Sequence, residues 1–425
     1  MKLRMLCIII AAFLAGSPAW GAGLWLYEGG TPDLGTAGAG RAALAADAST
    51  AGANPAGMTR LERSQMLLAV QGIYVNSRFD TEIADFGGGD GGNAGGFVPA
   101  GGLHYVHSMT EDFKMGVSMG SYFGLGVDYG DSWAGRYYVT EAELVTLGVN
   151  PGMGYRVNDW LSLGAGFSIV YAELTQKAAV NNAAVPGQAG LADGRLEIED
   201  DDVGYGFNLG VLLEPREDTR IGITYRSEVD LEFEDTAPLK NIGPILQGIL
   251  NISGLAGSKV DIDMTIPQAV MLSGYHQLND QWAILGNVGW QDWSAFGKQD
   301  LTLTSTTARS FTKDLDYDDT WHFALGAQYR FAPQWLWSVG AAYDTSPVDD
   351  DDKRSPDLPL DRQIRIGTGI QYDWNADVTI GLAYEYLDAG DAGIDQEGGP
   401  LQGDLKGEYD TNAIHFMAVN VIWRF

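Results

Sequence analysis

The chain ends in MAVNVIWRF, residues 417–425, and this stretch decides the fold. Every second residue in it is apolar: Met417, Val419, Val421, Trp423 and Phe425. The residues between them include Asn420 and Arg424. Successive side chains of a β-strand point to opposite faces, so one face here is apolar and the other mixed. This alternation is typical of a strand that separates lipid from a lumen.

The same alternation recurs along the chain. Residues 161–171, 321–331, 335–343 and 378–386 each carry an apolar residue at every second position, and residues 364–372 do so except at Thr368. We count fourteen such segments, which start near residues 64, 97, 112, 142, 159, 203, 218, 259, 281, 316, 335, 361, 376 and 411. In the eighth segment the phase of the alternation is ambiguous over residues 267–275.

The connections between these segments alternate in length. Six short turns separate seven long loops, which cover roughly 76–96, 127–141, 176–201, 234–258, 295–315, 345–361 and 388–410. A soluble β-sandwich would not sort its loops in this way, nor place tryptophans on the outward face of many strands. We therefore expect an all-β protein in which residues 64–425 form a 14-stranded antiparallel transmembrane β-barrel.

The N-terminus predicts an exported protein. Lys2 and Arg4 precede a short apolar run and then small residues, which is typical of a signal peptide over residues 1–21. The single cysteine, Cys7, lies within it. The excess of 56 acidic over 26 basic residues disfavours nucleic acid as a partner. No later apolar run is long enough for a membrane helix.

Residues 22–63 lack the strand alternation and are rich in glycine and alanine. Such a segment seldom forms a core of its own, so it is either a disordered leader or is enclosed by the rest of the chain. Its Asn54-Pro55-Ala56 triplet favours a turn before the first strand. With fourteen strands around it, we expect an N-terminal hatch that plugs the barrel lumen.

Taken together, the chain resembles the FadL family of outer-membrane transporters for hydrophobic compounds over almost its whole mature length. The resemblance implies a hatch in the lumen, ligand entry through an extracellular groove, and lateral release through a gap in the wall. It also implies that Asn54, Pro55 and Ala56 keep the hatch docked. The motifs that carry it are Asn54-Pro55-Ala56, Leu103-His104-Tyr105-Val106, Tyr122-Phe123-Gly124-Leu125-Gly126, Trp290-Gln291-Asp292-Trp293-Ser294-Ala295-Phe296, Tyr343-Asp344-Thr345-Ser346-Pro347-Val348 and Pro359-Leu360-Asp361-Arg362.

The fourth long loop contains a candidate substrate groove. Its apolar residues follow helical spacing between Pro244 and Gly254, and are Ile242, Ile245, Leu246, Ile249 and Leu250. This stripe either packs on a neighbouring loop or forms an adsorption groove with the third loop, and the two roles are compatible. A second candidate site lies in the lumen under the start of the hatch, at Leu24, Trp25 and Leu26.

In the third segment the apolar alternation is interrupted at Gly120, Tyr122, Phe123 and Gly124. Glycine within a strand often marks an ordinary bulge. The resemblance instead implies an inward kink that opens the wall.

Arg226, Arg365 and Arg424 fall on the lumen side of their strands. They pair either with lumen carboxylates or hatch backbone or, for one such as Arg226 or Arg365, with a substrate carboxylate.

The sequence offers no enzyme or cofactor signal. The acidic runs at 199–202 and 349–352 lack the spacing of a calcium loop, and the histidines lack metal-ligand spacing. The Gly-x-Ser-x-Gly nucleophile motif is absent. We expect neither catalytic residues nor a metal or cofactor site.

We expect passive uptake of long-chain fatty acids or similar compounds across the outer membrane of a Gram-negative bacterium. Two alternatives stay open: uptake of aromatic hydrocarbons by the same fold, and a non-transporting adhesive or structural barrel. The terminal Phe425 resembles the signal that the barrel assembly machinery reads. Expected partners are the hydrophobic substrate, that machinery and membrane lipid with lipopolysaccharide, around a monomeric barrel.

Overall fold

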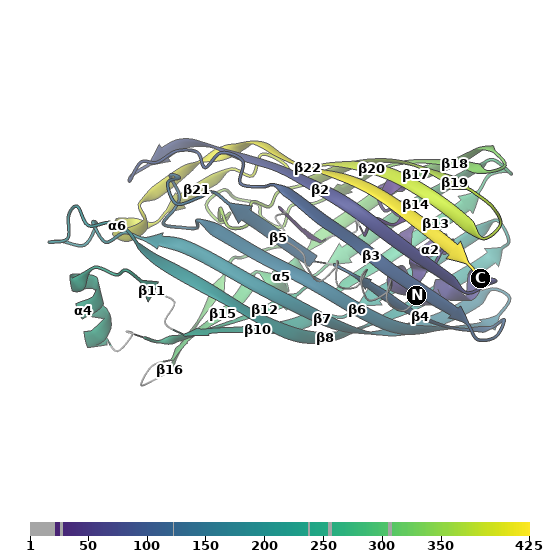
Figure 1. Ribbon diagram of the computed structural model, residues 1–425, viewed down its shortest axis with the longest axis horizontal. Helices are drawn as coiled ribbons and strands as arrows, with labels where there is room; N and C mark the ends of the chain where they lie inside the picture. The colour runs from purple at the N-terminus through teal and green to yellow at the C-terminus, as the bar shows by residue number, and fades with distance from the viewer. Residues whose placement is uncertain (1–21, 26–28, 122, 237–238, 254–256, 305–307) are drawn as a thin grey trace, which may run out of the picture.

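A closed antiparallel barrel of fourteen strands forms most of the molecule (Figure 1). The computed structural model describes residues 22–25, 29–121, 123–236, 239–253, 257–304 and 308–425. The ring closes where β2 pairs with both β3 and β22. Its strands are β2 (Gln65–Ala84), β3 (Phe97–Ser108), β4 (Phe113–Gly120) with its continuation β5 (Phe123–Asp128), β6 (Glu141–Asn158), β7 (Leu161–Val180), β8 (Gly194–Arg216), β9 (Thr219–Arg226), β13 (Ala269–Gln277), β14 (Trp282–Gln291), β17 (Thr320–Ala332), β18 (Trp335–Asp344), β19 (Gln363–Asp373), β20 (Val378–Asp388) and β22 (Asp404–Arg424).

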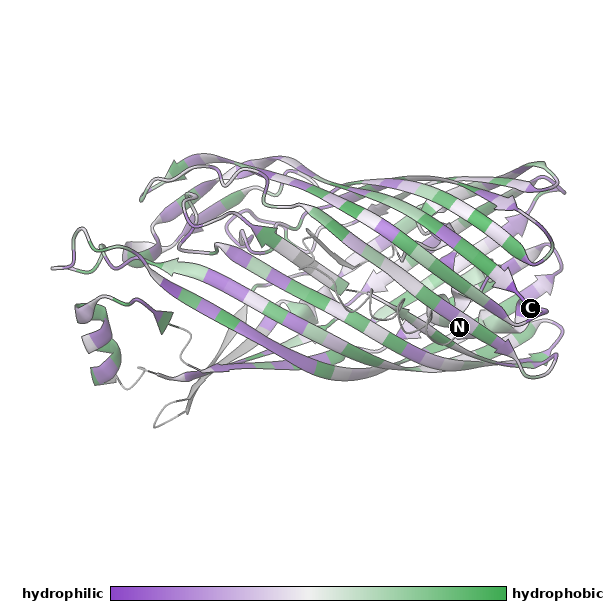
Figure 2. Ribbon diagram, viewed as in Figure 1, coloured by the Kyte–Doolittle hydropathy of each residue, from purple (hydrophilic) through white to green (hydrophobic). Residues whose placement is uncertain are grey.

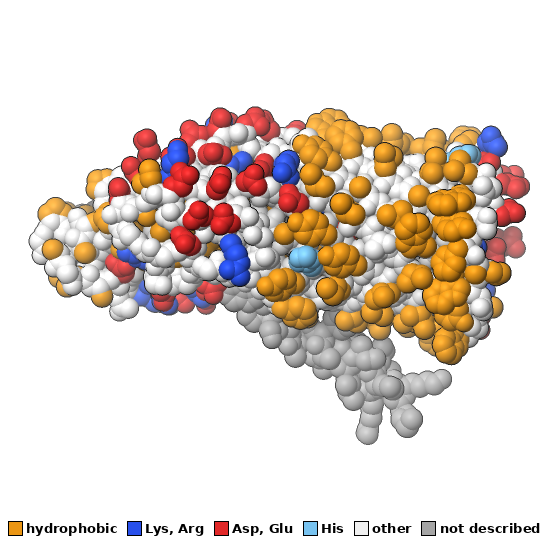
Figure 3. Space-filling view, turned by 90° about the horizontal axis from the view of Figure 1, so that it is seen from above, with side chains coloured by type: hydrophobic (Ala, Val, Ile, Leu, Met, Phe, Trp, Pro, Cys, Tyr) orange, Lys and Arg blue, Asp and Glu red, His pale blue; other side chains and the backbone are white. Residues whose placement is uncertain are grey.

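The predicted alternation is confirmed as an outside and an inside face. In β22, Met417 and Val419 are 60% and 50% exposed on the outside, whereas Asn420 is 1% exposed on the inside. Figure 2 shows the same alternation as stripes along the strands. The apolar side chains gather over one half of the barrel, and most acidic side chains over the other (Figure 3). An apolar band of this kind is what contact with lipid requires.

Short turns lie at one end of the barrel, which we call the turn end, and long loops at the other, the loop end (Figure 1). Three of the turns share one hydrogen-bonding pattern. Asn158, Asn279 and Asn375 each accept hydrogen bonds from two backbone N–H groups of the following residues. An asparagine side chain that bonds its own following backbone favours a tight turn. The expected order of turns and loops is confirmed.

Aromatic side chains encircle the turn end. Trp282 stacks on Tyr329 with ring centroids 4.4 Å apart, and Trp335 packs on Tyr372 at 4.5 Å. The ring of Phe425 stacks on Tyr105 at 6.1 Å. Aromatic girdles of this kind flank the apolar band of membrane barrels, because the ring is apolar and its polar edge reaches water.

The predicted start of the eighth barrel strand, near residue 259, is wrong. Residues from 259 onward form β12 (Lys259–Ile266), which leaves the barrel, and the barrel strand β13 begins only at Ala269. Pro267 lies between them and has no N–H for a ladder. β12 joins β10 (Val229–Thr236), β15 (Lys298–Thr304) and β16 (Ala308–Asp314) in a separate four-stranded sheet at the loop end.

That second sheet also changes two of the expected loops. Residues 234–258 contain the end of β10, β11 (Leu239–Lys240) and α4 (Pro244–Ser253), and residues 295–315 contain the end of α5 (Trp293–Phe296) and all of β15 and β16. Leu231, Phe233 and Ile262 are buried in one cluster with barrel residues such as Leu144 and Ala172. The sheet therefore extends the wall around the lumen at the loop end. Smaller elements there are β21 (Ile394–Glu397) and α6 (Gly399–Gln402).

The segment after β1 (Ala22–Trp25) forms short helical turns inside the barrel. They are η1 (Pro32–Thr36), α2 (Arg41–Leu44), α3 (Thr50–Ala53) and η2 (Pro55–Arg60), and nearly all their residues are buried. Small residues allow this fit: a Cβ at Gly222 or Gly340 of the wall would overlap the backbone of Ala42 or Thr36. We call residues 29–61 the hatch. The expected signal peptide, residues 1–21, lies outside the described residues.

Polar side chains of the barrel hold the hatch backbone. Asn287 of β14 accepts a hydrogen bond from Gly40 N at 2.8 Å and donates one to Gly38 O at 2.6 Å. Arg220 of β9 donates to Leu44 O at 2.7 Å. A hatch with so few regular hydrogen bonds of its own needs such partners, because buried backbone groups are costly to leave unpaired. In the described part of the chain, no helix is long and apolar enough to cross a bilayer.

Candidate functional site

The barrel wall is interrupted between β4 and β5. β3 and β4 pair only as far as the Gly102–Gly120 pair, and β5 pairs with β6 on one edge and β1 on the other. Residues 97–101 of β3 therefore have a ladder with β2 but, among the described residues, none on their other edge. Gly120 ends β4 and Phe123 begins β5, so the break lies where the alternation of the sequence is interrupted. Gly124 lies in β5, and Tyr122 is outside the described residues.

Aromatic packing holds β5 toward the lumen. Phe123 is 1% exposed, and its ring lies 5.5 Å from that of Phe296 and 6.1 Å from that of Trp293. Both partners belong to α5, in the Trp-Ser-Ala-Phe part of a motif singled out in the sequence. Phe123 N also donates to Thr146 Oγ1 on the neighbouring β6, at 3.2 Å. The break is thus a packed feature: along β6 the register shifts by one residue, as at a bulge, and on the β3 side the ladder stops.

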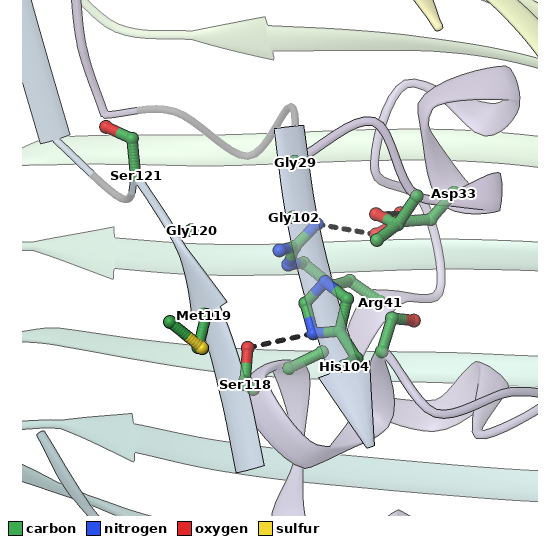
Figure 4. Close-up of a pocket in the computed structure, with 13 residues that line it drawn as sticks. Gly29, Asp33, Arg41, Gly102, His104, Ser118, Met119, Gly120 and Ser121 are labelled. Carbon is green, nitrogen blue, oxygen red and sulfur yellow. Dashed lines mark hydrogen bonds and ion pairs between the residues drawn. The ribbon is translucent and has the colours of Figure 1, made fainter. Parts of the chain in front are cut away.

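A small cavity lies directly behind the break (Figure 4). One side is made by the hatch, through residues that include Thr31, Asp33 and Arg41. The other side is made by β3, by the end of β4, and by Ser121 within the break. Arg41 Nη1 contacts Asp33 Oδ2 at 2.5 Å, and the Thr31 hydroxyl donates to the other oxygen of Asp33. The cavity thus joins the hatch to the opening in the wall.

His104 of β3 is a second nitrogen-bearing side chain at this cavity. It is 6% exposed, and its Nδ1 lies 2.8 Å from the hydroxyl of Ser118 on β4. Its Nε2 has no hydrogen-bond partner within the described residues. A Cβ at Gly102 would stand 2.9 Å from Nε2, so the glycine leaves space in front of this nitrogen.

Asn54 joins the hatch to the wall away from the cavity. Its side chain is fully buried and donates to Ala42 O at 2.6 Å and to Val211 O of β8 at 3.1 Å. Its Oδ1 accepts from Ala56 N at 3.1 Å, which caps η2 at Pro55. The triplet is therefore both a turn and a point of attachment between hatch and barrel.

Four of the five predicted stripe residues lie on α4, which protrudes at the loop end, and Ile242 lies just before it (Figure 1). Ile245 and Ile249 are 42% and 52% exposed, and Ile242, Leu246 and Leu250 are half-buried. Two side chains of the third loop hold the start of the helix: Asn182 accepts from Gly243 N at 2.8 Å and Gln188 from Ile245 N at 2.7 Å. The stripe is thus supported by the third loop and still presents an apolar surface.

The two predicted carboxylate partners do not line the cavity. Arg365 is 2% exposed and forms an ion pair with Asp344, and its Nε lies 3.7 Å from Glu385 Oε1. Arg226 Nη2 donates to Gly52 O at 3.4 Å. Both therefore make the protein contacts that the sequence left open as the alternative. Leu24 and Trp25 lie in β1, and Leu26 is outside the described residues.

The residues that line the cavity were missed in the sequence, except Gly120. Arg41 and Asp33 stand in a stretch without periodicity, and nothing in it shows that they meet. His104 carried a usable signal, because it lies on the inward phase of β3 with Val106 and so faces the hatch.

Among the described residues, no group of acidic, histidine or cysteine side chains is arranged to hold a metal ion. In the acidic run, Asp200 and Asp202 accept from backbone N–H groups of β10 at 2.6 and 2.9 Å.

Comparison with known proteins places these features in a family. Residues 12–425 match the family model described as outer membrane protein transport protein (OMPP1/FadL/TodX). A long-chain fatty acid transport protein of Escherichia coli O6:H1 is 30% identical over 406 residues, which cover 89% of this chain and 90% of the relative. Outer membrane protein P1 of Haemophilus influenzae is 29% identical over 428 residues, which cover 91% and 90%.

Solved structures show the same fold. A Pseudomonas aeruginosa FadL homologue superposes with a TM-score of 0.85 at 23% identity, covering 95% of this chain and all of the homologue. The toluene transporter TodX of Pseudomonas putida superposes with a TM-score of 0.64 at 17% identity, covering 89% and 94%.

Proposed function

This chain belongs to the OMPP1/FadL/TodX family of outer membrane transport proteins, and we propose that long-chain fatty acids are the compounds it takes up. Passive uptake of hydrophobic compounds across the outer membrane of a Gram-negative bacterium is the function of this barrel. The choice of fatty acids is supported by the 30% identity to a relative named for them. The aromatic-hydrocarbon relatives are similar at 17% identity, which supports only a common fold.

The first step is capture at α4. Its exposed Ile245 and Ile249 face solvent at the loop end, where a ligand arrives. Burial of apolar surface contributes about 0.8 kcal/mol per CH₂ group, so a long acyl chain gains several kcal/mol from a shallow apolar surface. Ile242, Leu246 and Leu250 complete the surface. A site in the lumen near Leu24, Trp25 and Leu26 would receive the chain next.

The last step is lateral exit through the break between β4 and β5. One observation carries this proposal: the wall is interrupted at the same place where the hatch leaves a cavity. An acyl chain that leaves there would enter lipid, because exposed side chains on the strands beside the break, such as Val70 and Phe97, are apolar. A small movement of the hatch, attached to β8 through Asn54, would widen the passage.

Uptake of labelled oleate tests the route in a Gram-negative host that lacks its own fatty acid transport protein. We expect wild-type protein to restore uptake, and removal of residues 242–250 to lower it at low oleate concentration. Uptake that is equal in both would contradict capture at α4. Growth on oleate and on toluene as sole carbon sources separates the aromatic alternative, and a barrel that supports neither would favour an adhesive or structural role.

The remaining expected partners are also proposals. The ring of Phe425 is 51% exposed and packs on Trp423 at 5.3 Å, so it is available to the barrel assembly machinery. Lipopolysaccharide would contact the acidic loop end. We further propose that the barrel acts as a monomer and as a transporter without catalytic activity.

A further inference from the structure

We propose that Arg41 and His104 form a binding site for the carboxylate of the transported molecule at the inner edge of the wall opening, with Asp33 as the competing internal anion. The inference rests on the proposed function, because it concerns an anionic head group that follows the acyl chain to the exit. It assigns a role to residues for which none was predicted from the sequence, and it separates carboxylates from neutral hydrocarbons.

The first observation is the position of Arg41. It starts the short helix α2 of the hatch, and its guanidinium points into the cavity behind the break (Figure 4). Its side chain is 16% exposed and that of Asp33 is 9% exposed, so the pair is shielded from water. A guanidinium presents several donors in a fixed plane that matches a carboxylate. The geometry that now holds Asp33 is therefore also suited to a ligand carboxylate.

The second observation is independent of the ion pair. His104 lies on the opposite wall of the cavity, is 6% exposed, and directs a nitrogen without a partner in the described residues toward the space left by Gly102. We assign the Ser118 hydroxyl as the donor to Nδ1, which puts the proton of the neutral ring on Nε2 and makes that nitrogen a donor. Buried polar nitrogens usually have a partner. A carboxylate oxygen in the cavity would supply one.

The exit step gives such a site a physical role. An acyl chain passes from the lumen into lipid without cost, but an isolated carboxylate in apolar surroundings is strongly disfavoured. Arg41 and His104 would hold the head group at the opening while the chain enters the membrane. Asp33 keeps Arg41 neutralised when no ligand is present and competes for it when one is. This competition limits the affinity, which lets the carboxylate leave.

The test uses two substitutions with opposite expected effects on full-length protein. Removing the cation by Arg41→Gln should weaken binding of dodecanoate to the purified barrel roughly tenfold or more, the loss typical of a hydrogen bond to a charged group. Removing the competitor by Asp33→Asn should tighten it several-fold. Dodecanol, which has the same chain and no charge, should bind equally to all variants. Isothermal titration in an uncharged detergent measures both ligands.

Matched controls come from an ion pair at the turn end. Arg63 and Asp377 lie 2.6 Å apart, are solvent-exposed and do not line the cavity, so Arg63→Gln and Asp377→Asn should leave both affinities unchanged. The double variant Asp33→Asn/Arg41→Gln removes both charges of the pair and serves if a single variant does not fold. It should bind dodecanoate more weakly than wild type.

Two results would overturn the inference. If Arg41→Gln and Asp33→Asn change dodecanoate binding in the same direction, the pair only stabilises the hatch. If dodecanol is affected as strongly as dodecanoate, the cavity does not recognise the carboxylate. Failure of the proposed function is distinct: wild-type protein would then not take up oleate in cells, whatever the binding measurements on the variants give.

Discussion

Asn54 of the hatch donates a hydrogen bond to the carbonyl oxygen of Val211 in β8, 3.1 Å away. The same amide nitrogen lies 2.6 Å from Ala42 O, so one side chain connects two parts of the hatch and the wall. Because the side chain is fully buried, water cannot replace these bonds. Asn54 is thus one of the points at which hatch and barrel are coupled.

We predict that Asn54→Ala loosens the hatch without unfolding the barrel. The substitution leaves two carbonyl oxygens without this donor, which typically costs about 1–3 kcal/mol for a buried group. Hydrogen exchange should become faster for hatch amides near Ala42 and Ala56, with β13 and β14 unchanged. Asn375→Ala, in a turn outside the lumen, is the control. Unchanged hatch exchange in Asn54→Ala would show that the bonds are not required.

A second prediction concerns the inward position of β5. Phe123→Ala removes the ring that packs on Trp293 and Phe296, and the loss of a buried aromatic side chain usually costs about 3–5 kcal/mol. We expect β5 and α5 to become more susceptible to proteolysis from the loop end, while the barrel keeps its resistance to detergent. Phe207→Ala on the outside of β8 is the matched control, since its ring is 45% exposed. Equal proteolysis in both variants would contradict the anchoring role.

The strands were predictable, and the reason is physical. Most side chains that a membrane barrel turns toward lipid are apolar, so Met417, Val419 and Val421 show the register of β22 directly. The eighth strand was misplaced because β12 is also alternating: Val260, Ile262 and Met264 are buried in the cluster that the second sheet forms with barrel residues. Alternation reports that one face is apolar, and it does not report whether that face meets lipid or protein.

The cavity residues could not be predicted in the same way. Arg41 meets Asp33 because η1 and α2 fold back on each other, and their path depends on where the wall offers room and donors. The α4 stripe was predictable because a helix of two to three turns repeats its apolar residues every three to four positions, and this spacing is visible in the sequence. The partner contacts of Arg365 were not, because they join residues on three different strands.

The third prediction uses the titration of Tyr138, which lies in the loop before β6. Burial raises its pKa to about 12, with a further contribution from the nearby carboxylates of Asp404 and Asp85. Its hydroxyl donates to Gly403 O at 2.6 Å. An unfolded tyrosine has a pKa of about 10, so the contribution of Tyr138 to loop stability is fully present below pH ~10 and is lost as the pH rises to about 12.

The measurement compares wild type with Tyr138→Phe. The difference in ultraviolet absorbance between them should show one phenol that ionises near pH 12. Hydrogen exchange of residues near Gly403 should accelerate between pH 10 and 12 in wild type, beyond the ordinary increase, and should lose that extra dependence in the variant. A difference titration centred near pH 10 would show that Tyr138 is not packed as described.

The last prediction tests α4 as the surface of first contact. Ile245→Ser and Ile249→Ser each remove an exposed apolar side chain, and a ligand that covers such a side chain only in part should lose about 1 kcal/mol of affinity. The oleate concentration for half-maximal uptake should then rise about fivefold for each, with the maximal rate unchanged. Gln247→Ser, on the polar side of the same helix, should have no effect. If the maximal rate falls instead, α4 acts after capture, because a defect in first contact is overcome by more ligand and a defect in passage is not.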